Sequence, residues 1–197
     1  MTDVQERLER DDVLASAASS GSAGLGGCTI RVLPPAARWS LRVAPAFAAA
    51  KPSLGGFSID QPINTIVGDT HMSLRLGPDE WMLISEQADS ATSGAITGAA
   101  GSQFHSLVDI SHRNIAIELS GHEATMILSS NCPRDLGERA FPAGSATRTL
   151  FGKAEIILAR PTTEPRFRIE CWRSFARYTH GLIADAAKLQ GIQLAVG

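Results

Sequence analysis

Segments typical of β-strands come in pairs along this chain, and helical segments separate the pairs. In Asn114–Leu119, for example, the apolar side chains of Ile115, Ile117 and Leu119 occupy alternate positions, which indicates a strand with one buried face. This recurring order favours an α+β fold with antiparallel sheets and helices packed on one face. The predicted strands are Thr29–Leu33, Arg38–Val43, Met72–Leu76, Glu80–Ser85, Phe104–Ile110, Asn114–Leu119, Thr147–Phe151, Ala154–Arg160, Arg166–Cys171 and Ile192–Val196.

Turn signals connect several of these strands. Pro34-Pro35 is predicted to join the first two strands, and Gly77-Pro78-Asp79 the next two. Phe104–Ile110 and Asn114–Leu119 are likewise predicted to pair. The intervening residues 44–70, rich in Ala, Pro and Gly, are predicted to form a long irregular connection.

Two short helices are predicted in the middle of the chain. Asp89–Ala100 is a weak helix, because Gly94 and Gly98 each cost up to ~1 kcal/mol relative to alanine. Ser120 is predicted to cap the second one, and Glu123 completes a capping box three residues later.

The longest helix is predicted near the C-terminus, with Ser174 as its N-cap and Gly191 as its C-cap. Its spacing predicts one apolar stripe as the buried face. The residues of that stripe are Phe175, Tyr178, Leu182, Ile183, Ala186 and Leu189.

Residues 1–27 are interpreted as a flexible N-terminal tail, because Ala15–Gly27 holds almost nothing but Ala, Ser and Gly. An alternative is a tail that becomes ordered against a partner. Residues 28–197 are predicted to form the folded domain. The recurring strand-pair-and-helix unit is compatible with two subdomains, about 28–103 and 104–197.

Composition excludes several classes of function. The formal net charge of the 197 residues is −2, and no basic cluster is visible, so nucleic-acid binding is not expected. The sequence contains no run of 18 apolar residues, so no membrane-spanning helix is predicted. The charged N-terminus does not resemble a signal peptide. The three cysteines are far apart and odd in number, which argues against a disulfide scaffold or a zinc site. We therefore expect a cytoplasmic protein with no membrane contact.

The chain shows no complete set of catalytic residues. Asp109, Ser111 and His112 suggest a hydrolytic triad, but on a strand His112 points away from the other two. Hydrogen bonding of Asp109 or Ser111 to nearby backbone at a strand end is the favoured interpretation. The histidine spacing fits no helical metal site, and no dinucleotide or phosphate-binding loop is present. Catalytic, cofactor-binding and metal-binding residues are accordingly predicted to be absent from this chain.

Four residues are candidate contacts to another subunit: Arg148, Trp172, Arg173 and Phe175. Arg148 lies in an apolar strand, so its guanidinium needs acceptors unless it is solvated. Asp109, Asp135 or a partner subunit could supply them. Trp39, Trp81 and Trp172 are expected to be core or interface residues, and Trp and Arg are enriched where interfaces derive most of their binding energy.

A series of motifs from about residue 25 to the C-terminus resembles, in order and spacing, the gamma subunit of heterotetrameric sarcosine oxidase. One departure is His122, where that family usually has proline; the fold is not expected to change. The motifs are Leu76-Gly77-Pro78-Asp79-Glu80-Trp81, Leu107-Val108-Asp109-Ile110-Ser111-His112-Arg113, Leu119-Ser120-Gly121, Cys132-Pro133-Arg134-Asp135-Leu136, Phe141-Pro142-Ala143-Gly144, Thr147-Arg148-Thr149-Leu150-Phe151-Gly152-Lys153-Ala154-Glu155 and Glu170-Cys171-Trp172-Arg173-Ser174-Phe175.

A wider resemblance connects Asp109-Ile110-Ser111-His112, Ser120-Gly121 and Ala124 with the glycine-cleavage aminomethyltransferases. This resemblance implies a folate-enzyme-like fold of two ferredoxin-like lobes. The chain has about half the length of those enzymes, so folate binding does not follow from it.

The family resemblance implies a non-catalytic subunit of an enzyme that oxidatively demethylates sarcosine. The products are glycine, hydrogen peroxide and a one-carbon unit that tetrahydrofolate accepts. It also implies alpha, beta and delta partners: alpha and beta hold FAD, FMN and NAD, delta holds zinc, and the folate site is on alpha. The alternative is a small folate-binding one-carbon-transfer module, for which Asp109 is the candidate carboxylate. An RNA-modification accessory role is disfavoured by the acidic net charge.

Overall fold

The computed structural model describes residues 27–87 and 91–197, so the expected tail over residues 1–27 lies, apart from Gly27, outside the described residues. The described chain forms an 11-stranded sheet in the order β13-β1-β9-β12-β11-β10-β5-β6-β7-β2-β8, and β3 and β4 form a separate hairpin. The strands are β1 (Cys28–Val32), β2 (Ala37–Val43), β3 (Ser53–Leu54), β4 (Phe57–Ser58), β5 (Thr65–Val67), β6 (His71–Arg75), β7 (Glu80–Ser85), β8 (His105–Asp109), β9 (Asn114–Ser120), β10 (Ser145–Phe151), β11 (Ala154–Arg160), β12 (Arg166–Trp172) and β13 (Leu194–Val196).

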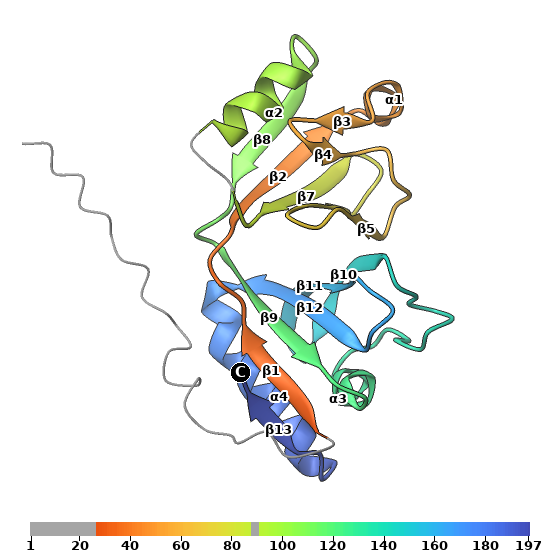
Figure 1. Cartoon of the computed structure of the whole chain (residues 1–197), viewed down its shortest axis with the longest axis vertical. Coiled ribbons are helices and arrows are strands. Elements are labelled where there is room, and N and C mark those ends of the chain that lie inside the picture. The colour runs from red at the N-terminus through yellow and green to blue at the C-terminus, as the bar shows by residue number, and fades with distance from the viewer. Residues whose placement is uncertain (1–26, 88–90) are drawn as a thin grey trace, which may run out of the picture.

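The long sheet folds into two lobes, one above the other in Figure 1. The upper lobe contains β2 to β8 with helices α1 (Pro45–Ala50) and α2 (Thr92–Ala100). The lower lobe contains β1 and β9 to β13 with α3 (Ala124–Ser129) and α4 (Ala176–Leu189). Ser145 of β10 pairs with Thr65 of β5 where the two halves of the sheet meet.

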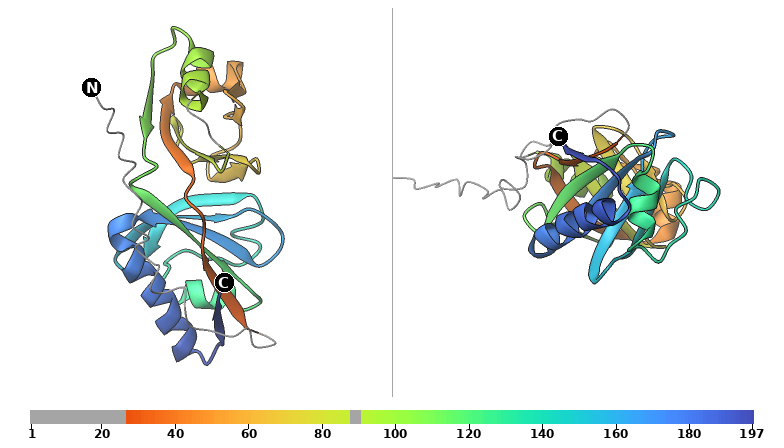
Figure 2. Two further views of the ribbon diagram at one scale, coloured as in Figure 1. Left: turned by 60° about the vertical axis from the view of Figure 1, so that its left-hand side comes forward. Right: turned by 90° about the horizontal axis from the view of Figure 1, so that it is seen from below.

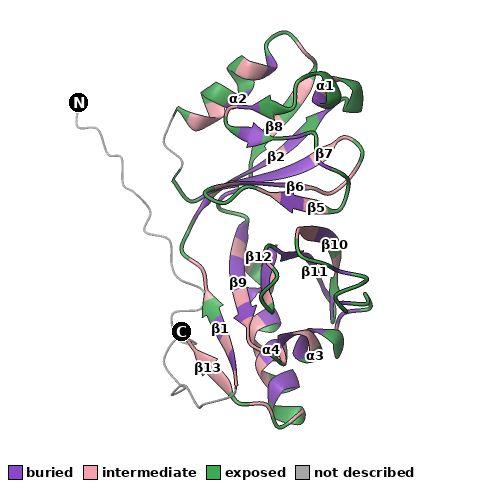
Figure 3. Ribbon diagram, turned by 45° about the vertical axis from the view of Figure 1, so that its right-hand side comes forward, coloured by how far each residue is buried: buried purple, intermediate pink, exposed green. Residues whose placement is uncertain are grey.

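Three apolar cores explain this arrangement. Residues of α1 and α2 pack on the outer face of the upper sheet, and residues of α3 and α4 pack on the outer face of the lower sheet. A third core fills the seam, defined here as the contact between the inner faces of the two sheets. The buried residues shown in Figure 3 therefore lie on both faces of each sheet. The predicted α+β class, with helices on one face of each sheet, is confirmed.

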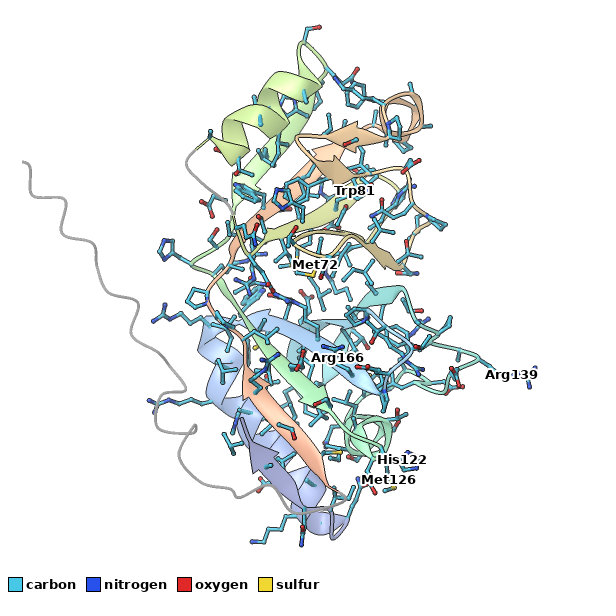
Figure 4. The ribbon with its side chains drawn as sticks, in the orientation of Figure 1. Met72, Trp81, His122, Met126, Arg139 and Arg166 are labelled. Carbon is cyan, nitrogen blue, oxygen red and sulfur yellow. The ribbon has the colours of Figure 1, made fainter. Side chains whose placement is uncertain are left out.

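Strand β7 shows how sequence produces these layers. Because side chains alternate across a strand, Trp81 and Leu83 enter the upper core, while Met82 and Ile84 enter the seam. Figure 4 shows Trp81 inside the upper lobe and Met72, on the adjacent β6, at the seam.

Two predicted strand pairings are wrong. β1 pairs with β9 and β13, whereas β2 pairs with β7 and β8; β8 and β9 are likewise in different lobes. Proline disfavours a helical backbone in the residue before it, so Pro34-Pro35 extends the crossing from one lobe to the other instead of reversing the chain. The two predicted subdomains, about 28–103 and 104–197, therefore exchange strands: β1 belongs to the lower lobe and β8 to the upper lobe. Figure 2 shows the two chain crossings, β1 to β2 and β8 to β9, side by side.

Residues 44–70 are not an irregular connection, because they contain α1 and the short strands β3, β4 and β5. Their apolar residues are needed in the upper core: Leu54, Phe57 and Ile59 are fully buried there. Because this segment is rich in Ala and Pro, its sequence did not predict these short elements.

Both predicted helix N-caps are wrong. Ser120 remains in β9, paired with Thr29 and Arg166, so it cannot cap α3. Ser174 lies in a short 3-10 helix, η1 (Arg173–Phe175), and α4 starts without a side-chain cap bond.

The buried face of α4 is also rotated from the predicted stripe. Ile183 and Ala186 are buried as expected, but Tyr178 and Leu189 are exposed. Small residues, Ala176, Thr179 and Ala187, take the remaining buried positions. Small side chains let α4 approach the sheet closely. Aromatic residues such as Tyr178 therefore lie on the side of the helix that faces away from the sheet.

Candidate functional site

The three residues that suggested a triad form a strand-end hydrogen-bond arrangement. Asp109 Oδ1 accepts a hydrogen bond from the Ser111 backbone N–H at 2.8 Å. Ser111 Oγ in turn accepts one from the Arg38 backbone N–H at 2.8 Å, which ties the two crossings together. His112 is exposed and belongs to neither contact. This is the strand-end role predicted for Asp109 and Ser111.

The buried carboxylate of the structure is Glu170, on β12, and not Asp109, which is exposed. Arg38 Nε donates to Glu170 Oε2 at 2.7 Å and Nη2 to Oε1 at 3.2 Å; both side chains are 1% exposed. Arg168 Nε donates to Glu170 Oε1 at 2.9 Å. Because Arg38 belongs to the upper lobe and Glu170 to the lower, this bidentate ion pair joins the lobes across the seam.

The sequence did not reveal this cluster. Arg166, Arg168 and Glu170 alternate with apolar residues, a pattern typical of a half-buried strand whose charged face lies in solvent. The upper lobe covers that face instead. The sequence does place three charged residues on one face of a single strand. Because such residues must be either solvated or paired inside the protein, this pattern was the signal that could have revealed the cluster.

Arg148 finds its carboxylate in neither Asp109 nor Asp135. Its Nη2 and Nη1 contact the Glu80 carboxylate at 2.5 and 3.3 Å, and Nε lies 3.7 Å from Glu155. Glu80 starts β7 in the upper lobe, so this is a second ion pair between the lobes. The hydrogen bond from Arg148 lowers the pKa of Glu80 below its usual value. Whether Arg148 also contacts another subunit stays a prediction.

The other three candidate contact residues lie together at the corner between β12 and α4. Trp172 and Tyr178 are 44% and 40% exposed, and Phe175 is half-buried between them. Ring centroids are 6.4 Å apart for Trp172 and Phe175 and 6.5 Å for Phe175 and Tyr178. We call Trp172, Phe175 and Tyr178 the aromatic patch. Tyr178 was assigned to the helix core by its spacing, and the rotation of α4 brings it here instead.

Backbone contacts hold the aromatic patch in place. The Tyr178 hydroxyl accepts a hydrogen bond from the Lys153 backbone N–H at 3.0 Å. The guanidinium of Arg113 lies 5.7 Å from the ring centroid of Trp172, and the Arg173 N–H donates to the Arg113 carbonyl at 2.8 Å. Gly152 has a φ of +58°, and a Cβ there would lie 2.4 Å from the Tyr178 hydroxyl oxygen. The Gly152-Lys153 turn therefore fits against the patch only with glycine.

Two surface cavities lie elsewhere on the lower lobe. One, of about 460 Å³, is lined by residues 133–135 and 147–149 with Ala140. Its carboxylate, Asp135, already accepts the Gly137 N–H at 2.8 Å. The other, of about 400 Å³, lies between α4 and the strands β1 and β13 and is mostly apolar. Burial lowers the pKa of His180, which lines it.

The possible metal ligands and the cysteine thiols of the described residues were also located. Within residues 27–87 and 91–197, no three His, Cys, Asp or Glu residues come together as metal ligands. Cys28, Cys132 and Cys171 are free and buried. Burial raises the pKa of the Cys171 thiol to about 12, so it is not a reactive thiolate near neutral pH. No described helix has the length and apolar character needed to span a membrane.

Comparison with known proteins assigns the family. The model of the "Sarcosine oxidase, gamma subunit family" matches residues 41–188. The chain belongs to the sarcosine oxidase gamma-subunit family. It is 30% identical to sarcosine oxidase subunit gamma of Arthrobacter sp. over 75% of this chain and 73% of that one. Identity to the same subunit of Corynebacterium sp. (strain U-96) is 28%, over 96% of this chain and 95% of that one.

Solved structures agree with this assignment. A chain of the heterotetrameric sarcosine oxidase from Corynebacterium sp. U-96, in complex with pyrrole 2-carboxylate, superposes with a TM-score of 0.76. That likeness, at 27% identity, covers 89% of this chain and 92% of the other. Aminomethyltransferase T of the Bartonella henselae glycine cleavage system has a TM-score of 0.62 at 11% identity, over 87% of this chain and 48% of that one. This second likeness supports the predicted aminomethyltransferase fold and shows the fold alone.

Proposed function

We propose that this chain is the non-catalytic gamma subunit of a heterotetrameric sarcosine oxidase. The complex demethylates sarcosine oxidatively to glycine, hydrogen peroxide and a one-carbon unit that passes to tetrahydrofolate. The observation that carries this proposal is the match, over most of both chains, to gamma subunits and to a chain of a heterotetrameric sarcosine oxidase.

The arrangement of charged groups supports a scaffolding role. Glu170 and Glu80, which come from opposite lobes, are each occupied by arginine, and Asp109 and Ser111 bind backbone. These groups hold the two lobes together and are not available as an acid, a base or a nucleophile. The chemistry is accordingly proposed to reside in alpha and beta subunits carrying FAD, FMN and NAD, with folate on alpha and zinc on delta. The assembly is proposed to be cytoplasmic.

Co-expression with and without this chain tests the proposal. The other subunits from the same source are produced in both cases, and sarcosine-dependent hydrogen peroxide formation and flavin content are measured. We expect a complete complex only when the chain is present, and no sarcosine oxidation by the chain alone. An equally stable and active complex without the chain would contradict the proposal.

The alternative, a folate-binding one-carbon-transfer module, derives its support from the likeness to the aminomethyltransferase. Its candidate carboxylate, Asp109, is exposed, and the buried Glu170 is already paired with two arginines. Calorimetric titration of the folded chain with tetrahydrofolate separates the two functions. Saturable heat that is lost in Asp109→Asn would favour the alternative, and no heat at millimolar ligand would reject it.

A further inference from the structure

Four basic residues lie close to the aromatic patch in the sequence or in the fold, although the chain as a whole is slightly acidic, with a net charge of −2. One exposed carboxylate, that of Glu155, lies two residues from Lys153 and is paired with Arg148. From Cys171 to Ala184 the sequence contains no Asp or Glu. The basic residues are Arg113, Lys153, Arg173 and Arg177.

We infer that the aromatic patch and its basic rim dock an acidic protein surface of another subunit in the sarcosine oxidase complex. The inference rests on the proposed function and adds to it the location and chemistry of the contact. Positive charge next to exposed rings favours a carboxylate-rich partner surface, because complementary charges steer association and fix register.

The apolar part of the surface has the features of an interface centre. Trp and Tyr contribute large, stiff side chains with few rotatable bonds, so their burial costs little conformational entropy. Here they are ordered before any partner binds, since Tyr178 is held by the Lys153 N–H and Trp172 packs against Phe175. Leu150, on β10, is 48% exposed as well. It lies opposite Glu155 on β11, whose carboxylate faces Arg148.

A protein partner fits this geometry better than single-stranded nucleic acid. Base stacking needs open aromatic faces. One face of Trp172 is occupied by the Arg113 guanidinium, and neighbouring rings meet at 51° and 72° and do not form a parallel platform.

Affinity measurements on the assembled complex test the inference. The full chain and its variants are titrated against the complex of the other subunits from the same source, at low and high salt. We expect Trp172→Ala to weaken binding by about 30-fold or more. We expect the double variant Arg113→Glu with Arg177→Glu to weaken binding and to lose most of its salt dependence.

Matched controls lie on the same helix. Lys188→Glu and Leu189→Ala change an exposed charge and an exposed apolar side chain at the other end of α4, and Leu189 is 88% exposed. Both control variants should bind as the unmodified chain does. Circular dichroism and thermal melting establish that every variant is folded.

The outcomes separate this inference from the proposed function. If the unmodified chain binds but folded patch variants bind equally tightly, the docking surface is wrong and the proposed function stands. If the unmodified chain binds none of the other subunits, the proposed function itself fails. Binding of a single-stranded oligonucleotide that Trp172→Ala abolishes would also overturn the inference.

Discussion

Glu170 supplies the buried carboxylate of the ion pair between the lobes. It accepts hydrogen bonds from Arg38 and Arg168, and its side chain is 1% exposed. A buried ion pair often adds little net stability, because removing two charges from water offsets their attraction. Removing one partner is different, since the other charge is then left buried and uncompensated.

We therefore predict that Glu170→Gln lowers the free energy of unfolding by about 3–5 kcal/mol. The variant keeps the shape of the side chain but leaves the Arg38 guanidinium without its counter-charge. Urea denaturation followed by fluorescence measures the change. The control is Glu164→Gln, which removes an exposed partner of Arg166 and should cost less than about 1 kcal/mol. A Glu170→Gln chain as stable as the control would contradict the prediction.

His180 gives a second prediction at the scale of one residue. Burial lowers its pKa, so the neutral imidazole is favoured in the folded chain. The unfolded chain takes up the proton first as pH falls below about 6.5. The stability contributed by the neutral form is therefore complete above that pH and is lost as the pH falls toward the lower, folded pKa.

Replacement by a side chain that does not titrate tests this sign. We expect His180→Gln to lose less stability than the unmodified chain between pH 7.5 and 5.5, as measured by urea denaturation at each pH. His122→Gln, which changes an exposed histidine away from the cavity that His180 lines, serves as the matched control. An unchanged pH dependence in His180→Gln would show that another group is responsible.

Among the elements, the turn between β10 and β11 and the helix α2 make opposite demands on glycine. Gly152 has a positive φ, and a Cβ there would meet the hydroxyl of Tyr178 at 2.4 Å and Leu182 at 2.7 Å. Gly98 lies in the interior of α2, and a Cβ there would meet nothing within 4 Å. The same change to alanine should therefore have opposite signs at the two positions.

We predict that Gly98→Ala raises the melting temperature, because alanine favours the helix by about 0.5–1 kcal/mol. Gly152→Ala should lower the melting temperature, because the turn must shift or Tyr178 must leave its place. Thermal unfolding of the two single variants measures both effects. A Gly152→Ala chain that melts at or above the unmodified temperature would show that the patch does not constrain the turn.

Element positions were easier to predict from sequence than element partners. The alternation in β9 and β12 predicted their positions closely, because a strand's burial pattern is local. Pairing is not local: the extended Pro34-Pro35 segment carries β2 to the other lobe, and nothing near it in sequence shows this. The aromatic patch was found in part, since Trp172 and Phe175 were singled out, whereas Tyr178 depended on the rotation of α4. Glu170 was missed because a second lobe covers its face.

At the scale of the molecule, the two lobes are joined by the seam core and by ion pairs at different depths. Arg38 with Glu170 is buried, and Arg148 with Glu80 is half-exposed. Added salt should therefore weaken the outer pair more than the inner one. Two such pairs specify how the lobes sit against each other more narrowly than an apolar seam alone.

The outer pair predicts a measurable titration. Because Arg148 lowers the pKa of Glu80, its stabilisation is present above the ordinary carboxyl pKa of about 4.3 and is lost as pH falls through the lower folded value. In Arg148→Ala the pKa of Glu80 should rise, as followed by carboxyl NMR titration. Arg134→Ala, a change to an exposed arginine that packs over Phe141, serves as the control and should leave Glu80 unchanged. Arg42 Nη2 also lies 3.1 Å from Glu80 Oε2, so no upward shift in Arg148→Ala would show that Arg42 alone sustains the effect.

The crossing of β1 into the lower lobe has a consequence for how the protein is made. β1 is the first described strand to leave the ribosome, yet its neighbours are β9, from the middle of the chain, and β13, at the C-terminus. The nascent chain therefore holds an unpaired strand until β9 emerges, and β13, the outermost strand of the lower sheet, emerges after every other described strand. Conversely, the strands of the upper lobe are complete once β8 has emerged, well before the lower lobe is. Synthesis thus imposes an order, upper lobe first, on a molecule in which the first and last described strands are neighbours.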